Sequence, residues 1–282
     1  MSTPKNRSVQ KAFAILRSFR APDEWLTCAE LSRRAGLPGA SGYRLIQTLE
    51  LIGAVIRDER GRYSPGMLLM SLSRYVAHDR LLRDAANAIL TEVASDLGMI
   101  VHMGVLEDGM VTYVAKTGGG SSFHVHTEVG AQLEAYCSAL GKVLLSALPQ
   151  HELAMFLDEG DLVPLTTNTI TDPSAFRSEI DRVRRQGWAL DDCEISRNMR
   201  CVAVPIKDAT GQIVAAISSS GEASSVTEEQ QEKILARLRS AAEAIEANIC
   251  RTGGPSPFRL APREMRFGRK SAALGFADSV SH

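Results

Sequence analysis

The segment 26–63 constrains the fold of this chain more than any other, because it contains two short amphipathic helices joined by a tight turn. Thr27 can cap the first helix, and Glu30, three residues later, fits the acidic position of a capping box. Gly36 is expected to end that helix in a left-handed conformation, and Pro38 suits the start of the second. Two helices joined in this way can present the second one to the major groove of DNA.

The second helix separates apolar from polar side chains. Its inward face is predicted to carry Leu45, Ile46, Leu49 and Ile52. Two short strands follow and flank the turn Asp58-Glu59-Arg60-Gly61, which predicts an arginine-rich hairpin. A helix-turn-helix followed by such a hairpin indicates a winged helix. The side chains then placed to meet DNA are Ser41, Tyr43, Arg44, Gln47 and Thr48 on the helix and Arg57, Arg60 and Arg62 on the wing.

Charge supports DNA binding over the blander interpretation, in which any small three-helix domain shows the same pattern. Residues 1–75 contain twelve Lys and Arg against six Asp and Glu, a balance of +6, although the whole chain carries −1. Residues 76–250 contain fourteen basic and twenty-five acidic residues. This asymmetry is expected where a phosphate-binding module is joined to a different one. A third helix over 8–19 is predicted from a stripe of Val9, Ala12, Phe13, Leu16 and Phe19.

Composition limits the class of protein further. At 282 residues and 44% hydrophobic content, the chain can bury a substantial core, and two domains are expected. The chain has no apolar run of membrane-spanning length and no signal-peptide core, so we expect a cytoplasmic protein that does not bind membranes. Its cysteines lack C-x-x-C spacing, which argues against a disulfide framework or a zinc knuckle. They are Cys28, Cys137, Cys193, Cys201 and Cys250.

The rest of the chain favours hairpins over regular βαβ units. Strands are expected at 100–106, 110–116, 123–129, 188–195, 201–207 and 212–219, and helices at 81–97, 139–148, 151–157, 173–187 and 227–249. This grouping predicts an α+β domain on an antiparallel sheet. The expected organisation is a winged helix over 1–66, a linker helix over 67–78, a second domain over 79–250 and a disordered tail over 251–282.

Several short motifs occur in a fixed order along the chain. The winged-helix part carries Thr27-x-Ala29-Glu30-Leu31-Ser32, Gly36-Leu37-Pro38, Tyr43-Arg44-Leu45 and Arg62-Tyr63-x-x-Gly66. The second domain carries Ser138-Ala139-Leu140-Gly141-Lys142, Thr169-Ile170-Thr171-Asp172-Pro173, Gly187, Asp191-Asp192, Arg200-Cys201-Val202-Ala203-x-Pro205 and Ile217-Ser218-x-Ser220-Gly221. Their joint order and spacing resemble the IclR family of bacterial transcriptional regulators, over about residues 8–249.

The resemblance implies a dimerising winged-helix domain, a connecting helix and a GAF-like C-terminal domain that binds a small organic effector, in a homodimer or homotetramer. The expected function is an effector-responsive regulator of a catabolic pathway, which binds a double-stranded DNA operator and has neither enzymatic activity nor a cofactor. In the recognition helix, Gly39 stands where the family commonly has Lys, and Gly42 where it has Val or Ala. A glycine inside a helix costs about 1 kcal/mol relative to Ala. The operator sequence of relatives therefore does not transfer to this chain.

Relatives place effector contacts on strands and on one helix of the second domain. The resemblance implies contacts at Ala139, Leu140, Asp191, Met199, Cys201, Ser218 and Ser220, with an apolar wall at Val125 and Leu133. Strand alternation independently puts Ser218 and Ser220 on one face. Buried hydroxyls need hydrogen-bond partners, which are either a polar ligand or the local backbone and water.

The expected effector is a small organic acid, hydroxylated or aromatic. The helix that begins at Ala139 can bind a carboxylate through its free backbone N–H groups. Asp191 would repel a second carboxylate, so we expect it to accept a hydrogen bond from an effector hydroxyl or to hold a water. Lys142 is expected to point along the helix rather than into the cavity.

Other functions have weaker support in the sequence. His124 and His126 share a strand face, but without a third ligand they do not indicate a metal site. Cys201 with His102 or His124 is a conceivable nucleophile pair for a small-acid-processing enzyme with an appended winged helix, although such pairs are usually structural. A protein-binding adaptor would not need the +6 balance of the first 75 residues.

Overall fold

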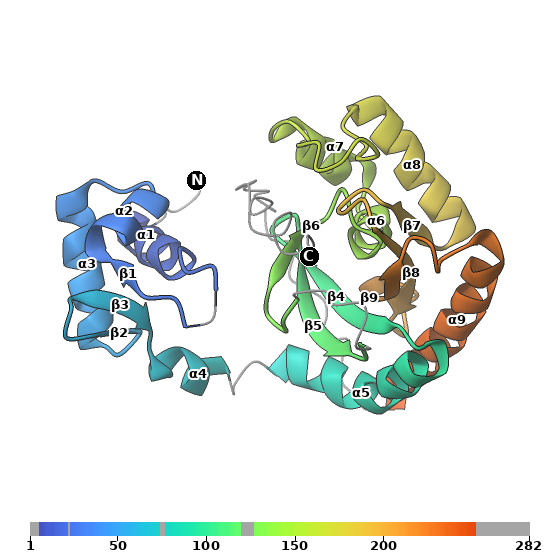
Figure 1. Ribbon diagram of the computed structural model, residues 1–282, viewed down its shortest axis with the longest axis horizontal. Helices are drawn as coiled ribbons and strands as arrows, with labels where there is room; N and C mark the ends of the chain where they lie inside the picture. The colour runs from blue at the N-terminus through green and yellow to red at the C-terminus, as the bar shows by residue number, and fades with distance from the viewer. Residues whose placement is uncertain (1–5, 22, 74–76, 120–126, 252–282) are drawn as a thin grey trace. The chain divides into compact units, whose positions relative to one another are not determined.

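The structure is a computed structural model that describes residues 6–21, 23–73, 77–119 and 127–251 (Figure 1). The chain divides into two compact units, Met1–Ala77 and His78–His282. Each unit has its own hydrophobic core. Within the described residues, no helix is both long enough and apolar enough to cross a membrane.

The N-terminal unit is a winged helix-turn-helix, as predicted. Its helices are α1 (Arg7–Leu16), α2 (Cys28–Arg34), α3 (Gly39–Leu51) and α4 (Met67–Ser73). Its strands pair antiparallel in the order β1-β3-β2, with bounds Leu26–Thr27 for β1, Val55–Arg57 for β2 and Arg62–Pro65 for β3. The buried core includes Ile15, Leu31, Ile46, Leu49, Val55 and Tyr63.

The helix caps follow the sequence in part. The Thr27 hydroxyl accepts a hydrogen bond from the Glu30 backbone N–H at 3.2 Å, so the predicted N-cap of α2 is confirmed. The second half of the capping box is wrong, because the Glu30 carboxylate pairs with Arg33 at 2.6 Å and Arg34 at 2.8 Å. Gly36 takes a φ of 64° after α2, as predicted. Leu26 and Thr27 also form a short strand that the sequence did not indicate.

The predicted apolar faces need correction. Val9 and Phe13 in α1 are 53% and 59% exposed, whereas the predicted Ala12, Leu16 and Phe19 pack against the core. Ile15, which was not predicted, is the buried residue of that helix. In α3, Ile46 and Leu49 are buried as predicted, but Ile52 is 54% exposed. The helical spacing of apolar residues shows that they share one face of the helix. It does not show which surface covers that face, and the surface can belong to another chain.

The packing of α2 against α3 explains why position 42 is a glycine in this chain. A Cβ atom at Gly42 would lie 2.0 Å from Ser32 Oγ and 2.8 Å from Ser32 Cβ. Helices α2 and α3 therefore approach each other more closely than an alanine would allow. This close approach explains why a residue of low helix propensity stands inside the recognition helix.

The C-terminal unit is an α+β domain on a six-stranded antiparallel sheet of order β6-β5-β4-β9-β8-β7, as predicted. The strands are β4 (Ile100–Glu107), β5 (Met110–Thr117), β6 (Gln132–Glu134), β7 (Ala189–Asp192), β8 (Met199–Lys207) and β9 (Ile213–Glu222). The helices are α5 (Ala77–Leu97), α6 (Ala139–Ser146), α7 (Gln150–Asp158), α8 (Pro173–Gln186) and α9 (Glu228–Arg251).

The sheet separates two hydrophobic cores (Figure 1). One face packs on α5 and α9 through residues such as Val101, Val202 and Ile217. The other face packs on α6, α7 and α8, and it carries Cys201 and Ala203. Side chains alternate between faces along each strand, so every second residue of β8 and β9 faces α6.

Two predicted elements differ from the structure. The strand expected at 123–129 is not formed over its described part, 127–129. The strand that pairs with β5 on the side away from β4 is β6. Residues 123–126 lie outside the described residues. Over the segment expected as a linker helix, 67–78, α4 spans Met67–Ser73 and α5 begins at Ala77. The expected tail, apart from Arg251 at the end of α9, also lies outside the described residues.

Candidate nucleic-acid interface and ligand cavity

The outer face of α3 presents polar side chains to solvent. Tyr43, Arg44 and Thr48 are exposed, and Ser41 is half-buried. Gln47 differs from the prediction, because its amide donates to Tyr63 Oη at 3.2 Å and is turned toward the wing. Four of the five predicted helix residues are therefore available to a partner, whereas Gln47 connects α3 to the wing.

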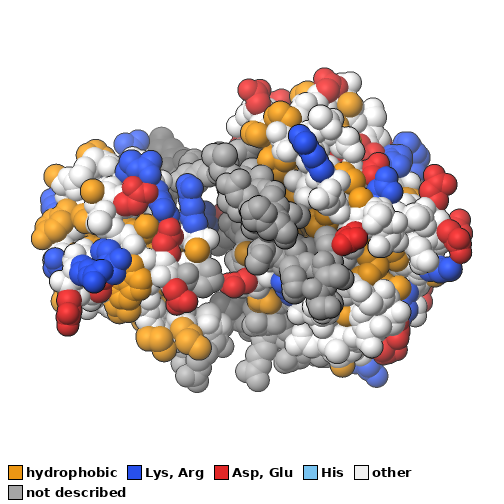
Figure 2. Space-filling view, viewed as in Figure 1, with side chains coloured by type: hydrophobic (Ala, Val, Ile, Leu, Met, Phe, Trp, Pro, Cys, Tyr) orange, Lys and Arg blue, Asp and Glu red, His pale blue; other side chains and the backbone are white. Residues whose placement is uncertain are grey.

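The wing arginines lie in different environments. Arg60 is exposed at the tip, and the Arg57 guanidinium lies 5.8 Å from the ring centroid of Tyr63. Arg62 Nε bonds Asp58 Oδ2 at 2.9 Å, so its charge is already partly neutralised. Figure 2 shows Lys and Arg side chains beside exposed hydrophobic side chains on the visible face of the N-terminal unit.

In the C-terminal unit, the strand register aligns polar residues in two rows on the α6 side of the sheet. One row runs from Asp191 through Cys201 and Ser220 to Ile100. The next row runs from Ala189 through Ala203 and Ser218 to His102. The predicted common face of Ser218 and Ser220 is confirmed, and the Ser219 side chain on the opposite face contacts Met99 Sδ at 3.3 Å.

A cavity of about 20 Å³ lies between these rows and the start of α6. It is lined by His102, Tyr113, Leu133, Ser138, Ala139, Leu140, Ile195, Met199, Cys201, Ser218 and Ser220. This volume is room for about one water molecule. An organic ligand would therefore have to displace side chains such as Met199, which is flexible enough to adjust.

Seven of the nine residues expected at the effector site line this cavity. They are Leu133, Ala139, Leu140, Met199, Cys201, Ser218 and Ser220. Asp191 is not among the lining residues and lies fully buried beside Cys201 in the same row. Val125 lies outside the described residues. Sequence reasoning missed Tyr113, Ser138 and Ile195 as lining residues, and it gave His102 no role in binding.

The start of α6 is both buried and capped. The Ser138 hydroxyl accepts from the Gly141 N–H at 3.0 Å and so caps the helix. Ala139 and Leu140 are the first two residues of the helix, so their N–H groups have no partner inside it. A Cβ atom at Gly141 would lie 2.0 Å from the Ala135 carbonyl oxygen, so α6 sits directly on that backbone. The helix N-terminus is therefore held against the cavity.

His102 and Tyr113 form a neutral polar wall. Their ring centroids are 4.8 Å apart, and His102 Nε2 lies 2.6 Å from Thr127 Oγ1. Burial, and then the nearby Lys116 charge, lower the pKa of His102 to about 3. Burial raises the pKa of the Tyr113 phenol. Both side chains are uncharged near pH 7, and each can take part in hydrogen bonds to a ligand.

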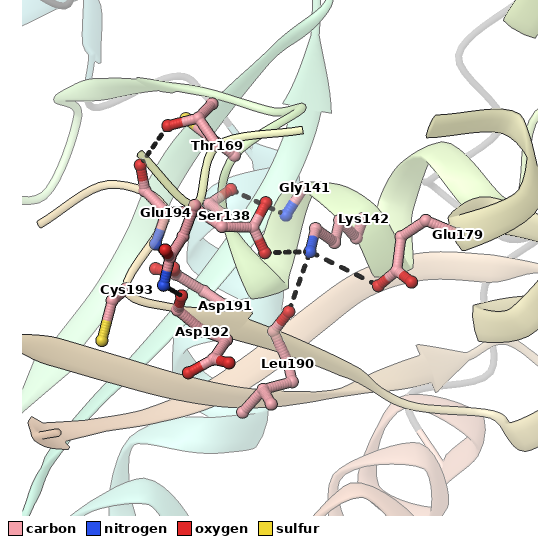
Figure 3. A network of polar contacts seen from close by, with 12 residues as sticks. Ser138, Gly141, Lys142, Thr169, Glu179, Leu190, Asp191, Asp192, Cys193 and Glu194 are labelled. Atoms are coloured by element: carbon pink, nitrogen blue, oxygen red, sulfur yellow. Dashed lines mark hydrogen bonds and ion pairs between the residues drawn. The ribbon is translucent and has the colours of Figure 1, made fainter. Parts of the chain in front are cut away.

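Behind the cavity, Lys142 is buried in a network of acceptors (Figure 3). Its Nζ donates to Glu194 Oε1, to the Leu190 carbonyl oxygen at 2.9 Å and to Glu179 Oε1 at 3.4 Å. Arg182 in turn bonds Glu179 at 2.8 Å. Lys142 does not line the cavity, as expected, but its complete burial was not predicted.

Cys201 is a poor nucleophile in this position. Burial raises the pKa of its thiol well above the usual value. His102 is unprotonated at neutral pH and cannot stabilise a thiolate. The pair Cys201 and His102 therefore does not provide an activated thiolate, and His124, the other predicted partner, lies outside the described residues. Among the described residues, no group of three His, Cys, Asp or Glu side chains is arranged to hold a metal ion.

These features define a two-domain protein that combines a winged helix with an antiparallel-sheet domain, in which a small cavity is lined by apolar and polar side chains. Residues 74–247 match the family model for the bacterial transcriptional regulator IclR C-terminal domain, and residues 8–59 match the IclR helix-turn-helix domain. The chain belongs to the IclR family of transcriptional regulators, with a DNA-binding helix-turn-helix domain and a C-terminal effector domain.

Individual relatives agree with this assignment. The Pca regulon regulatory protein of Pseudomonas putida is 31% identical over 80% of this chain and 78% of its own length. The crystal structure of Thermotoga maritima IclR is 30% identical, with a TM-score of 0.63 over 86% of this chain and 98% of that chain. An IclR homolog from Microbacterium hydrocarbonoxydans, complexed with 4-hydroxybenzoate, is 23% identical, with a TM-score of 0.75 over 86% of this chain and 99% of that chain.

Proposed function

We propose that this regulator controls a catabolic pathway and that a small organic acid, bound in the cavity beside α6, changes its affinity for DNA. The observation that carries the proposal is the cavity itself. It combines a buried helix N-terminus with the Ser218 and Ser220 hydroxyls and an apolar wall. These features suit a carboxylate, a hydroxyl and a carbon skeleton respectively. We expect the protein to act in the cytoplasm.

The proposed binding residues are the seven cavity-lining positions together with Asp191, and His102 and Tyr113 extend this set. Val125 remains a prediction. The proposal is tested by a thermal-shift screen of small acids that starts with 4-hydroxybenzoate, the ligand of one homolog. A ligand at a hundredfold excess over its dissociation constant stabilises the folded state by about 2.7 kcal/mol.

The control for this screen is the double variant Ser218→Ala, Ser220→Ala, which removes both hydroxyls and keeps the strand. Acids should shift the melting temperature of the parent more than that of the variant. Equal shifts in both proteins would place the ligand elsewhere. Shifts given by sugars, nucleotides or metals alone would contradict the proposed ligand class.

The DNA contacts are proposed at the exposed face of α3 and at the wing. They comprise Ser41, Tyr43, Arg44 and Thr48 with Arg57, Arg60 and Arg62, whereas Gln47 is proposed only through its contact with the wing. Arg44→Ala should weaken binding to an operator selected from a random DNA pool without changing the unfolding transition, because Arg44 is exposed. Unchanged affinity in Arg44, Ser41 and Tyr43 variants would show that the recognition face is misassigned.

A homodimer or homotetramer is proposed because two half-sites read together add their binding free energies. The N-terminal unit supports this with apolar side chains that its own core does not cover. They are Val9 and Phe13 in α1 and Met67, Met70 and Leu72 in α4. Light scattering at micromolar concentration should give a mass at least twice the 30.5 kDa of the chain. A particle of the single-chain mass would contradict the proposal.

A further inference from the structure

Lys142 has no hydrogen bond left for the neighbouring carboxyl group of Asp191. An ammonium group has three N–H donors. In this protein they are directed at Glu194, Glu179 and the Leu190 carbonyl oxygen (Figure 3). The positive charge of Lys142 is therefore already shared between the carboxylates of Glu194 and Glu179.

Asp191 is buried without a cation of its own. Its Oδ1 accepts from the Glu194 N–H at 2.7 Å, and its side chain is fully buried. Its Oδ2 has no hydrogen-bond partner among the described residues. The titratable groups that face it are Cys201 from β8, Tyr113 from β5, Lys142 from α6, Cys137 ahead of α6, and Cys193 and Glu194 from the loop after β7.

This arrangement disfavours a charged Asp191. Within that group only Lys142 is cationic, and burial raises the pKa of each of the facing thiols and of the phenol, which therefore stay neutral. An ionised Asp191 would add a second negative charge beside Glu194 in a region without water access. Buried charges are tolerated when they are paired and are otherwise neutralised by a proton.

We infer that Asp191 binds the effector in its protonated form and donates a hydrogen bond to the effector carboxylate, so that effector binding is coupled to proton uptake wherever Asp191 of the ligand-free protein is ionised. This inference rests on the proposed function. It also reverses the role that the sequence indicates for Asp191, which was that of an acceptor for an effector hydroxyl.

The cross-strand row places Asp191 next to a residue that lines the cavity. Asp191 pairs with Cys201, and Cys201 pairs with Ser220, so the three side chains lie on one face of neighbouring strands. Cys201 and Ser220 line the cavity, as do the first residues of α6. Asp191 itself does not line the cavity, so a carboxylate bound at the start of α6 reaches it only after side chains such as Cys201 adjust to the ligand. A neutral Asp191 supplies a donor there, whereas an ionised one would repel the ligand.

The pH at which the coupling operates follows from the environment. Burial, and then the Glu194 carboxylate, raise the pKa of Asp191 to about 7. A bound anion favours the protonated form and raises this pKa further. Below about pH 6 the proton is already present, so the dissociation constant is independent of pH. Above about pH 8 each unit of pH should weaken binding by up to about tenfold, as expected for the uptake of one proton.

The protonation itself can be tested without a ligand. In the folded chain Asp191 titrates near pH 7, while in the unfolded chain an Asp titrates near pH 3.9. The folded state therefore binds the extra proton between these values, and the stability that it provides is lost as pH rises through 7. The asparagine of Asp191→Asn cannot ionise. The melting temperature of the parent minus that of Asp191→Asn should therefore be larger at pH 5 than at pH 8.

The matched control is Asp192→Asn, which changes the next carboxylate on the same strand, a half-exposed group that pairs with Arg200 at 2.6 Å. It should not alter the pH dependence. The inference is overturned if the difference in melting temperature between the parent and Asp191→Asn is the same at pH 5 and at pH 8. If Asp191→Asn does not fold, the infrared band of a protonated carboxyl group in the parent decides instead, because that band should weaken as pH rises through 7.

The coupling to ligand is tested on the full-length protein by calorimetry with 4-hydroxybenzoate, in two buffers of different ionisation enthalpy. The parent should take up about half a proton per site at pH 7 and nearly one at pH 8. Asp191→Asn should bind without proton uptake, and Asp192→Asn should match the parent. Binding without uptake in the parent overturns the inference. Absence of binding counts against the proposed effector class, while the unfolding comparison still decides whether Asp191 is protonated.

Discussion

Two helices, α3 and α6, present their N-termini in opposite environments. Helix α3 begins after Pro38, which provides no side-chain cap, and its first residues Gly39 and Ala40 are exposed. Helix α6 begins after the capping residue Ser138, and its first residues Ala139 and Leu140 are buried. Both ends favour a negative charge through the helix dipole. The N-terminus of α3 is exposed to a large polyanion, whereas the N-terminus of α6 is buried beside a small cavity.

The difference shows that exposure to solvent affects how many charged or hydrogen-bonding groups a site needs to bind an anion. At a protein surface, water and salt weaken each charge interaction, so the winged helix surrounds α3 with several arginines. In the buried cavity a few donors act in a low dielectric and are worth more each. The exposed site should therefore respond to salt, and the enclosed one to pH.

The two helices are also fixed in position by different means. Both have a glycine where a neighbour is too close for a Cβ atom, namely Gly42 against Ser32 and Gly141 against Ala135. Only α6 is additionally connected to the domain by a buried charge, through Lys142. Removal of these contacts, one at a time, separates their contributions.

The largest effect is expected from Lys142→Met. This change keeps the side-chain length but leaves Glu194 and Glu179 buried without their shared cation. Loss of one partner from a buried ion pair costs about 3–5 kcal/mol. Urea unfolding should show this loss in the C-terminal domain, and adding Glu194→Gln should restore part of it.

The surface control for this variant is Arg33→Met, which removes a cation from the exposed pair with Glu30 in α2. It should leave the unfolding midpoint unchanged within error, because exposed ion pairs contribute little. Comparable destabilisation by Arg33→Met and Lys142→Met would show that burial of the Lys142 network contributes nothing to stability.

A smaller effect is expected from Gly42→Ala in the N-terminal unit. The added methyl group gains about 1 kcal/mol of helix propensity. It also collides with Ser32, and overpacking of this kind costs about 1–3 kcal/mol. We expect a net loss of stability and weaker DNA binding, measured by urea unfolding and fluorescence anisotropy. Gly39→Ala is the matched control, because a Cβ at Gly39 meets open space and should not destabilise α3.

The features that the sequence predicted correctly are mostly local. Thr27 caps α2 through its own side chain, so a short motif was enough to find it. The common face of Ser218 and Ser220 follows from strand alternation alone. These interactions lie within a few residues of each other, and their geometry depends little on the rest of the fold.

The features that were missed depend on distant partners. The burial of Lys142 depends on Glu179 and Glu194, which are 37 and 52 residues away. His102 reaches the cavity because β4 pairs with β9 in a register that places it opposite Ser218. A sequence pattern carries no information about such a register. Strand alternation alone shows that His102 and Ile100 share a face, but not that this face meets the cavity.

The wing offers a comparison within the exposed site. Arg60 is exposed, whereas Arg62 already pairs with Asp58 at 2.8 Å. Arg60→Ala should reduce the slope of log affinity against log salt by about one, as expected for the loss of one phosphate contact. Arg62→Ala should reduce it by less, because its charge is partly neutralised in the free protein. Anisotropy with a nonspecific duplex measures both, and equal slopes would show that Asp58 releases Arg62 on binding.

The smallest effect is expected for salt on effector binding. The residues that line the cavity are buried, so a carboxylate bound at the start of α6 should be shielded from ions in solution. Between about 50 and 200 mM salt, the dissociation constant of the acid that gives the largest thermal shift should change by less than about twofold. Over the same range, DNA binding with 6–10 phosphate contacts weakens by about 10³–10⁵. Calorimetry and anisotropy on one protein sample give both values. A strong salt dependence for the acid would place its carboxylate at the surface, outside the cavity behind which Asp191 lies.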